Sequence, residues 1–239
     1  CSHYFPTWYL GNFPEREVIL CSYEADFAAS WGRKVRDTLT ECADTGLFPV
    51  RPRGDVKAAH RWQLAGHRGG MVTAGAGGAI TGKGADLLII DDPFKNAQDA
   101  NSETVRNTVW EWWQSTASTR LSPTGVVLLI NTRWHLDDLS GRLLQREPER
   151  WQCVNFPAIA EEADDLGRQP GEALWPARFP LDALEEKREQ SGSYFWQAMY
   201  QQRPVTRGGE MFRREWFTLV GGPPAKVVAR CRYWDRAAT

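Results

Sequence analysis

The stretch LLIIDDPFK, residues 87–95, predicts the fold of this chain more directly than any other segment. Four consecutive aliphatic residues run into two adjacent carboxylates, Asp91 and Asp92, and then into a proline. A short apolar run without polar alternation is typical of a central strand that is covered on both faces. Because ligands bind beside the carboxyl ends of strands in an open parallel sheet, we expect both aspartates to stand in a ligand crevice.

The paired carboxylates have the arrangement of a Walker B motif. Carboxylate oxygens are hard ligands that suit Mg²⁺. Asp91 would hold the metal that bridges the β- and γ-phosphates, and Asp92 would orient the water that attacks the γ-phosphate. The second acid of such pairs is more often Glu, and Asp92 is shorter. A solvated acidic turn remains the alternative, because Asp also favours turns and helix caps.

Composition places the chain among globular proteins. It has 239 residues, of which 42% are apolar, enough for one large α/β domain or for one domain plus a fragment. The formal charge of −1 excludes a globally basic surface, so any contact with nucleic acid must use local basic patches. Five scattered cysteines without a C-x-x-C pair disfavour a disulfide scaffold and a zinc site, and they favour a reducing cytoplasm.

Strand and helix patterns alternate through the first half of the chain. Residues 17–22 (EVILCS) predict a short buried strand, and residues 23–39 predict an amphipathic helix. A strand followed by a helix is the repeating unit of α/β folds. The glycine-rich residues 71–90 predict a hairpin that leads into the acidic strand. The expected apolar face of the helix consists of Phe27, Trp31, Val35 and Leu39.

A second polar cluster follows another apolar run. Residues 102–121 predict a helix that begins at Ser102, and residues 126–130 (VVLLI) predict a fully buried strand. If this strand is parallel to the acidic one, it delivers Asn131 and Thr132 to the same sheet edge as the two aspartates.

The rest of the chain predicts a helix near residues 137–145, a strand near 151–156 and a helix from Leu181 toward Tyr200. The opening residues resemble the middle of a helix, and the first residue is Cys1, so we expect the chain to be truncated at its start.

A phosphate-binding loop is absent where its spacing is nearly matched. Residues 77–84 (GGAITGKG) fit such a loop as far as Lys83, but Gly84 stands where a metal-binding hydroxyl is required. The acidic strand follows so closely that no helix can hold the phosphate. We therefore favour a glycine-rich hairpin, and we expect any genuine loop to lie just upstream of Cys1.

Five segments occur in consistent order along the chain: LLIIDDPFK (87–95), VWEWWQSTASTRLSP (109–123), VVLLINTRWHLDDLSGRLL (126–144), YFWQAMYQQRP (194–204) and RYWDRAAT (232–239). Together they resemble the large terminase subunit of tailed bacteriophages, the motor that packages DNA into proheads. The resemblance covers essentially the whole chain. It implies a P-loop NTPase core of the ASCE type with a mainly parallel sheet over residues 1–200, without its Walker A loop. It further implies a linker at 201–225 and the first strand of an RNase H-like nuclease domain at 226–239.

The resemblance also implies roles for residues. Asp91 would be the Walker B metal acid and Asp92 the catalytic carboxylate. Asn131 and Thr132 would form a coupling motif that senses the γ-phosphate, although a simple hydrogen-bonding role at a strand end stays open. Asp235 would be one of several carboxylates that hold two metals, Mg²⁺ or Mn²⁺, in the nuclease. One carboxylate cannot build that site.

Three basic residues could place a positive charge on the transition state, in this subunit or as an arginine finger in its neighbour's site. The sequence does not choose among them, and each could equally be a solvated or structural cation. These residues are Arg68, Lys83 and Arg133. His135 with Asp137 and Asp138 could suggest a metal site, but a helix N-cap at one of the two aspartates is favoured.

The implied function is that of a terminase large subunit, whose parent protein uses ATP and Mg²⁺ to translocate viral double-stranded DNA and cuts it with a metal-dependent endonuclease. The implied partners are viral DNA, the portal protein and the small terminase subunit, with a homo-oligomeric ring in the bacterial host cytoplasm. Two alternatives remain: a catalytically inactive prophage remnant that binds DNA or motor partners, and a helicase-like ATPase. No run of apolar residues approaches the roughly 20 needed to cross a membrane.

Overall fold

The computed structural model describes residues 1–55, 58–80, 84–164 and 166–205. Residues Cys1–Val205 form one compact unit, which includes residues 201–205 of the expected linker. The rest of that linker and the expected nuclease strand lie outside the described residues. Among the described residues, no helix has the length and apolar character that a membrane span requires.

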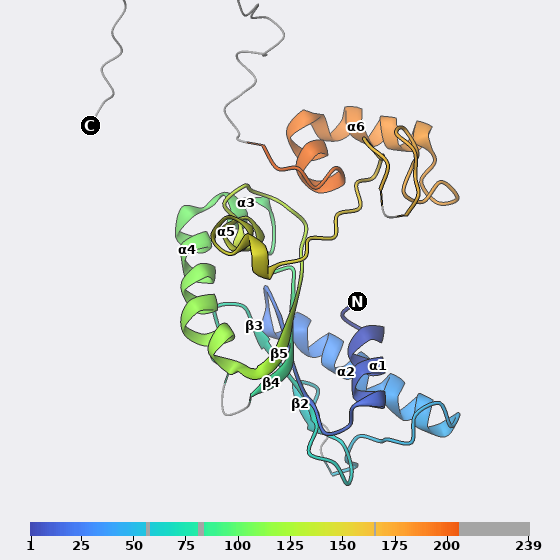
Figure 1. Cartoon of the computed structure of the whole chain (residues 1–239), viewed down its shortest axis with the longest axis vertical. Helices are drawn as coiled ribbons and strands as arrows, with labels where there is room; N and C mark the ends of the chain where they lie inside the picture. Colours follow the sequence, from blue (N-terminus) through green and yellow to red (C-terminus); the bar gives the residue numbers. More distant parts are fainter. Residues whose placement is uncertain (56–57, 81–83, 165, 206–239) are drawn as a thin grey trace, which may run out of the picture. The chain divides into compact units, whose positions relative to one another are not determined.

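The unit is an α/β fold built around one sheet (Figure 1). The strands are β1 (Glu17–Ser22), β2 (Arg61–Gln63), β3 (Gly70–Gly75), β4 (Ala85–Asp91) and β5 (Leu121–Ile130). The α-helices are α1 (Tyr4–Asn12), α2 (Ala25–Asp44), α3 (Ala97–Asn101), α4 (Glu103–Trp112), α5 (Leu139–Arg146) and α6 (Leu181–Phe195). Short 3-10 and π segments follow as η1 (Trp113–Ala117), η2 (Ser118–Arg120), η3 (Pro148–Arg150) and η4 (Trp196–Tyr200).

The sheet order is β2-β3-β1-β4-β5. Strands β3, β1, β4 and β5 are mutually parallel, and only β2 is antiparallel to its neighbour. In the register, Ser22 pairs with Gly75 on one side and with Asp91 on the other, and Asp91 pairs with Ile130. Four strands therefore end at the same edge of the sheet. The predicted α/β class with a mainly parallel sheet is confirmed.

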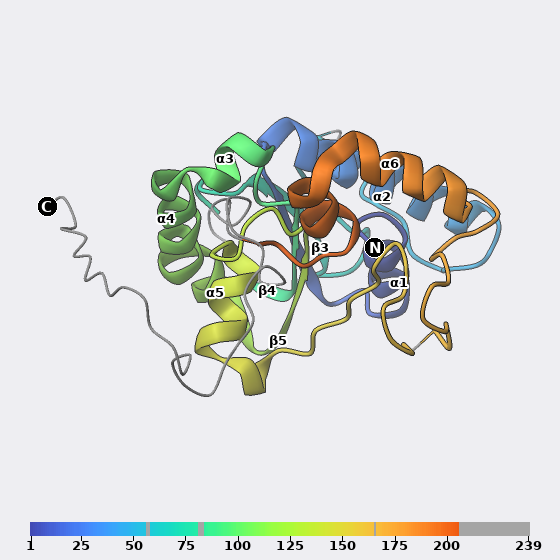
Figure 2. The same ribbon diagram turned by 90° about the horizontal axis from the view of Figure 1, so that it is seen from above.

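Helices cover both faces of this sheet, as Figure 2 shows. On one face, alternate residues of β1 and β4 pack with α1 and α2 in a cluster that includes Leu10, Leu20 and Ile89. On the other face, the remaining residues pack with α4 and α5 in a cluster that includes Ile90 and Trp112. Because both faces of β4 are buried, its residues read as a continuous apolar run, as the sequence predicted.

The predicted hairpin before the acidic strand is wrong. Strand β3 does not pair with β4, because β1 lies between them and is parallel to both. The residues after β3 cross the face of the sheet instead. Ile80 is buried in the cluster on that face, and the indole Nε1 of Trp112 donates to the carbonyl of Gly78 over 2.9 Å. This packing against α4 replaces the local turn that the glycines suggested.

Helix α2 is longer than predicted, and its buried face is different. The side chain of Phe27 is 37% exposed, whereas Gly32 lies in the buried stripe. The physical reason is a close approach, because Trp62 Nε1 donates to the carbonyl of Gly32 over 3.0 Å. The buried residues of the helix are Ala28, Gly32, Val35 and Leu39.

Helix α4 begins where the sequence predicted. The hydroxyl of Ser102 accepts a hydrogen bond from the backbone N–H of Val105, which caps the helix. The helix gives way to η1 and η2 after Trp112, and β5 then begins at Leu121, earlier than expected. The predicted full burial of VVLLI is wrong, because β5 is the last strand of the described sheet and Val126 is 61% exposed.

The later segments divide between success and failure. The helix expected from Leu181 toward Tyr200 is confirmed as α6 followed by η4, with a kink at Gly192, whose φ is +70°. The strand expected near residues 151–156 is absent from the described residues, which have no regular structure there. Its alternating apolar residues are largely exposed rather than packed against the sheet.

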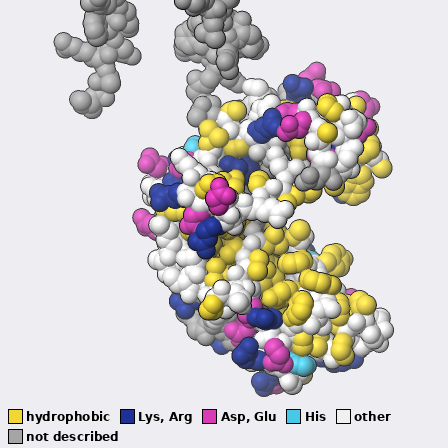
Figure 3. Space-filling view, viewed as in Figure 1, with side chains coloured by type: hydrophobic (Ala, Val, Ile, Leu, Met, Phe, Trp, Pro, Cys, Tyr) yellow, Lys and Arg dark blue, Asp and Glu magenta, His cyan; other side chains and the backbone are white. Residues whose placement is uncertain are grey.

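Apolar side chains also gather on part of the surface. In the view of Figure 3 they lie over α1, whose large exposed side chains are Tyr4, Phe5 and Trp8.

Candidate functional site

The structure brings the two polar clusters of the sequence to one place. Strands β4 and β5 are parallel, with Asp91 opposite Ile130, so Asp92 and Asn131 leave the sheet side by side. The convergence that the sequence could only state conditionally is therefore confirmed. The site consists of Asp91 and Asp92 together with residues 131–138, which connect β5 to α5 and are termed the β5–α5 turn.

Asp92 has an unusual backbone conformation that its neighbours hold in place. Its φ is +45°, in the left-handed region that Asp tolerates better than most residues. Its N–H donates to the carbonyl of Ile130 over 2.8 Å, and its carbonyl accepts from the N–H of Tyr23 over 3.0 Å. Its carboxylate Oδ1 accepts from the backbone N–H of Thr132 over 2.9 Å. Two backbone hydrogen bonds thus fix the conformation of Asp92, and a third fixes its carboxylate.

Asp91 lies deeper, where β4 meets the start of α1. Only 9% of the residue is exposed. Burial raises the pKa of its carboxyl above the usual 3.8, and the charge of Asp92 raises it further. The Ser2 side chain hydrogen-bonds to this carboxyl and lowers its pKa in part. Since Ser2 lies two residues before Tyr4, where α1 begins, the segment that leads into this helix lies against the acidic end of β4.

Ser22 is a residue of this site that the sequence did not reveal. It ends β1, pairs with Asp91 in the register and is fully buried. Among the described residues, its hydroxyl is one of a few buried side-chain atoms without a hydrogen-bond partner. Such atoms are usually satisfied in proteins, so an unpaired hydroxyl beside a carboxylate suits a site that takes a ligand. The oxygen donors of Asp91 and Ser22 fit a hard cation such as Mg²⁺.

Asn131 and Thr132 occupy ordered positions at this edge. The Ser140 hydroxyl of α5 donates to Oδ1 of Asn131 over 2.5 Å, and Nδ2 of Asn131 donates to the carbonyl of Thr132 over 3.3 Å. Thr132 contacts Asp92 through its backbone N–H, so its hydroxyl is not needed for that bond.

Arg133 is held by a buried partner. Its Nε donates to Oδ2 of Asp138 over 2.8 Å, and the side chain of Asp138 has no exposed surface. Burial raises the pKa of Asp138, while the charge of Arg133 lowers it. The other oxygen of Asp138 accepts from the N–H of Gly141 over 2.8 Å and caps α5. Arg133 is therefore engaged within its own turn in this structure.

The same geometry decides between the two interpretations of His135, Asp137 and Asp138. The favoured N-cap is confirmed at Asp138. Within the part of the chain that the structure describes, no group of three or more His, Cys, Asp or Glu side chains is placed to hold a metal ion.

The remaining candidate cations lie elsewhere. Arg68 is exposed just before β3, at the opposite edge of the sheet from Asp91, and its backbone N–H donates to Glu15 over 3.1 Å. The structure therefore does not bring Arg68 to the site of its own chain. Lys83 and Asp235 lie outside the described residues. Strand β4 begins at Ala85, so no helix follows the GGAITGKG segment, as the sequence predicted.

The fold and this edge define the class: an α/β protein with a mostly parallel sheet, compatible with a P-loop-type core. A family model described as terminase large subunit, T4likevirus-type, N-terminal matches residues 2–219. The chain belongs to this family of phage terminase large subunits, as the sequence motifs indicated. A search of the curated proteins found no match. Terminase large subunits are in general ATPase and nuclease enzymes of phage DNA packaging.

Proposed function

We propose that this chain carries the ATP-hydrolysing site of a DNA-packaging motor, with Asp91 as the Walker B acid. One observation supports this proposal above the others. Parallel β4 and β5 end together, and they hold a buried carboxylate, a second carboxylate and a polar turn at the edge where ligands bind in such sheets.

The residues divide the chemistry among them. Asp91, with the Ser22 hydroxyl nearby, would hold Mg²⁺, which neutralises charge on the phosphates when it is bound. Asp92 would orient the attacking water through its Oδ2, since its Oδ1 accepts from Thr132. Asn131 and Thr132 would respond to the γ-phosphate and pass that response to α5 through Ser140.

The phosphate-binding loop belongs directly before α1 in this proposal. The contact between Ser2 and Asp91 supports that position, because it puts the segment that leads into α1 beside the metal acid. The N-terminus of a helix also favours phosphate through its unpaired N–H groups and its dipole.

The wider functions follow from the family and are proposed with it. They are translocation of viral double-stranded DNA, cleavage by an RNase H-like nuclease with Mg²⁺ or Mn²⁺ bound at carboxylates that include Asp235, and assembly with the portal and the small terminase subunit as a ring in the host cytoplasm.

Substitution at Asp92 tests the proposal. In the protein expressed from its complete gene, Asp92→Asn should lower ATP turnover by about 100-fold or more, because an amide cannot act as the base-like carboxylate. Asn tolerates the left-handed conformation and can still accept from Thr132, so the fold should be preserved. The readout is steady-state phosphate release with Mg²⁺.

The matched control is Asp37→Asn, which alters an exposed carboxylate on α2 that pairs with Arg36. Its turnover should equal that of the unaltered protein. Near-normal turnover in Asp92→Asn would remove the proposed role. An unaltered protein without ATP turnover would favour the inactive remnant.

A further inference from the structure

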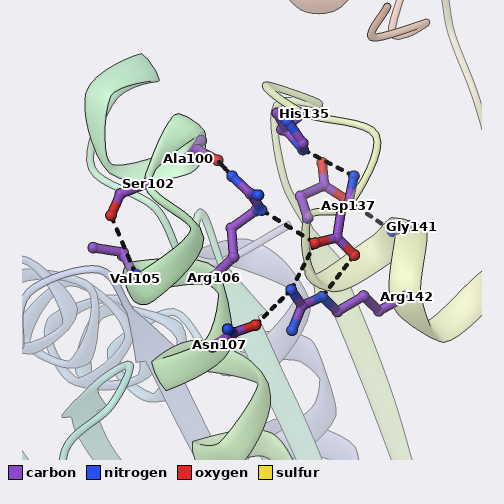
Figure 4. Close-up of polar contacts among 10 residues, drawn as sticks. Ala100, Ser102, Val105, Arg106, Asn107, His135, Asp137, Gly141 and Arg142 are labelled. Atoms are coloured by element: carbon purple, nitrogen blue, oxygen red, sulfur yellow. Dashed lines mark hydrogen bonds and ion pairs between the residues drawn. The ribbon is translucent and has the colours of Figure 1, made fainter. Parts of the chain in front are cut away.

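The β5–α5 turn keeps its shape without helix or strand geometry. Residues 131–138 contain no regular secondary structure, yet they carry Asn131 and Thr132. At the sheet end of the turn, Thr132 bonds to Asp92. At the far end, Asp137 lies just before α5 and accepts hydrogen bonds from side chains of α4 and α5 (Figure 4).

Arg106 of α4 makes one of these contacts with Asp137. The residue is 8% exposed, and a guanidinium buried to this extent needs partners for its charge and its N–H groups. Its Nη1 donates to the carbonyl of Ala100 over 2.8 Å, and its Nε donates to Oδ2 of Asp137 over 3.2 Å. A single buried side chain thus joins α3, α4 and the turn.

Arg142 of α5 makes the second contact with Asp137. Its Nε donates to Oδ1 of Asp137 over 2.8 Å, and its Nη2 donates to Oδ2 over 2.6 Å, a two-pronged contact. The same Nη2 donates to Oδ1 of Asn107 on α4 over 2.8 Å. Hydrogen bonds from Arg142, and then from Arg106, hold the pKa of Asp137 below its usual value, so this carboxylate stays charged at neutral pH.

The two arginines differ in reach. Arg142 is only five residues from Asp137 and fixes the start of α5, with one exposed hydrogen bond to Asn107 on α4. Arg106 is 31 residues away and comes from a helix that packs on the sheet, so it ties the turn to the body of the fold. The backbone N–H of Asp137 donates to the side-chain Nδ1 of His135 over 3.0 Å, which stiffens the turn between these points.

We propose that Arg106 is a positioning residue for ATP hydrolysis. Acting through Asp137, it holds the β5–α5 turn so that the backbone N–H of Thr132 stays on the Asp92 carboxylate and Asn131 stays at the sheet edge. The inference rests on the proposed function, because it assigns Arg106 to the same site. Arg106 does not touch the reacting atoms in this account.

The test compares Arg106→Gln, Arg106→Lys and Asp137→Asn in the protein expressed from its complete gene. Turnover is measured per folded molecule, with folding followed by thermal melting, and kcat is separated from KM for ATP. In Arg106→Gln and Asp137→Asn, the backbone N–H of Thr132 should no longer be held on the Asp92 carboxylate. We therefore expect kcat to fall by about 10- to 100-fold while KM changes by less than about threefold. Lysine cannot reproduce the fork of the guanidinium, so Arg106→Lys should recover only part of the loss.

A double-mutant cycle tests whether Arg106 acts through Asp137. Because both changes break the contact between Arg106 and Asp137, the variant with Arg106→Gln and Asp137→Asn should lose less turnover than the product of the two single losses. The matched control is Arg33→Gln, at an exposed arginine on α2, which should leave kcat unchanged.

Two results would overturn the inference. One is an unchanged kcat per folded molecule in Arg106→Gln, even if its melting temperature falls, because a purely structural arginine behaves in that way. The other is multiplication of the two single losses in the double variant. Either result, obtained while Asp92→Asn is inactive, would leave the proposed function intact; normal turnover in Asp92→Asn would remove the proposed function itself.

Discussion

At the scale of single residues, the candidate site shows how far local sequence reaches. The sequence predicted that Asp91 and Asp92 follow a buried strand, because an apolar run and its charged end are local features. It could not predict the left-handed backbone of Asp92, since that conformation depends on bonds to Tyr23 and Ile130 from other segments. It also missed Ser22, whose significance comes only from its register with Asp91.

The buried carboxyl of Asp91 predicts a particular dependence of stability on pH. Its pKa is raised above 3.8 in the folded protein, so the folded state binds a proton more tightly than the unfolded state does. The stability from this group is fully present below the unfolded pKa and is lost as pH rises through the folded pKa. Asp91→Asn should therefore increase the free energy of unfolding at pH 7, as urea denaturation would measure.

The same gain should disappear when the unfolding of both proteins is measured below about pH 3, where Asp91 is mostly protonated in the folded and in the unfolded state. A variant that is less stable than the unaltered protein at pH 7 would contradict the claim that burial dominates at Asp91. The comparison is made without Mg²⁺, because a bound cation would stabilise the ionised carboxylate.

At the scale of elements, periodicity predicted α2 but not the direction that it faces. An i, i+4 series of large apolar residues suggested Phe27 and Trp31, yet the tight approach of Trp62 at Gly32 rotates the buried stripe toward smaller residues. Packing between distant segments decided this face, and the helix sequence alone does not contain it.

The close approach at Gly32 predicts a destabilising substitution. A Cβ at this position would lie 2.4 Å from the carbonyl oxygen of Ala59 and 2.9 Å from Cγ2 of Thr73. Although alanine favours helices over glycine, the backbone contact cannot yield cheaply, so Gly32→Ala should lower the free energy of unfolding by about 1–3 kcal/mol. Urea denaturation at pH 7 provides the measurement.

Arg33→Ala on the exposed side of α2 serves as its control and should change stability by no more than about 0.5 kcal/mol. If Gly32→Ala stabilised the protein instead, helix propensity would outweigh the contact with Ala59.

At the scale of the whole molecule, the sequence predicted strands better than their order. Glu17–Ser22 matches the predicted strand, and the acidic strand lies where the sequence put it. The hairpin before β4 failed because β3 pairs with β1, a choice that depends on non-local contacts. The predicted full burial of β5 was wrong for the same reason. The residues VVLLI have the composition of a central strand, but non-local pairing places them at the edge of the described sheet.

The edge of β5 predicts self-association of the isolated unit. Among the described strands β5 has one neighbour, and an apolar edge strand with exposed residues is prone to pair with other chains. Val126→Lys should reduce light scattering at high protein concentration, because a charge on an edge strand opposes such pairing. Arg33→Lys is the neutral control. Equal scattering from the variant and the unaltered protein would show that association uses another surface.

Strand β5 also lies at the margin of both hydrophobic clusters, one on each face of the sheet. Val127 and Leu129 extend the apolar cluster on the α4 side, while Leu128 and Ile130 extend the cluster on the α1 side, and all four are only partly covered. A polypeptide segment that paired with β5 as an additional strand would cover the apolar clusters on both faces of the sheet in one step. Its binding should therefore be cooperative, and partly bound states should be scarce. The heat capacity should fall on binding by an amount that reflects burial of apolar surface on both faces of the sheet.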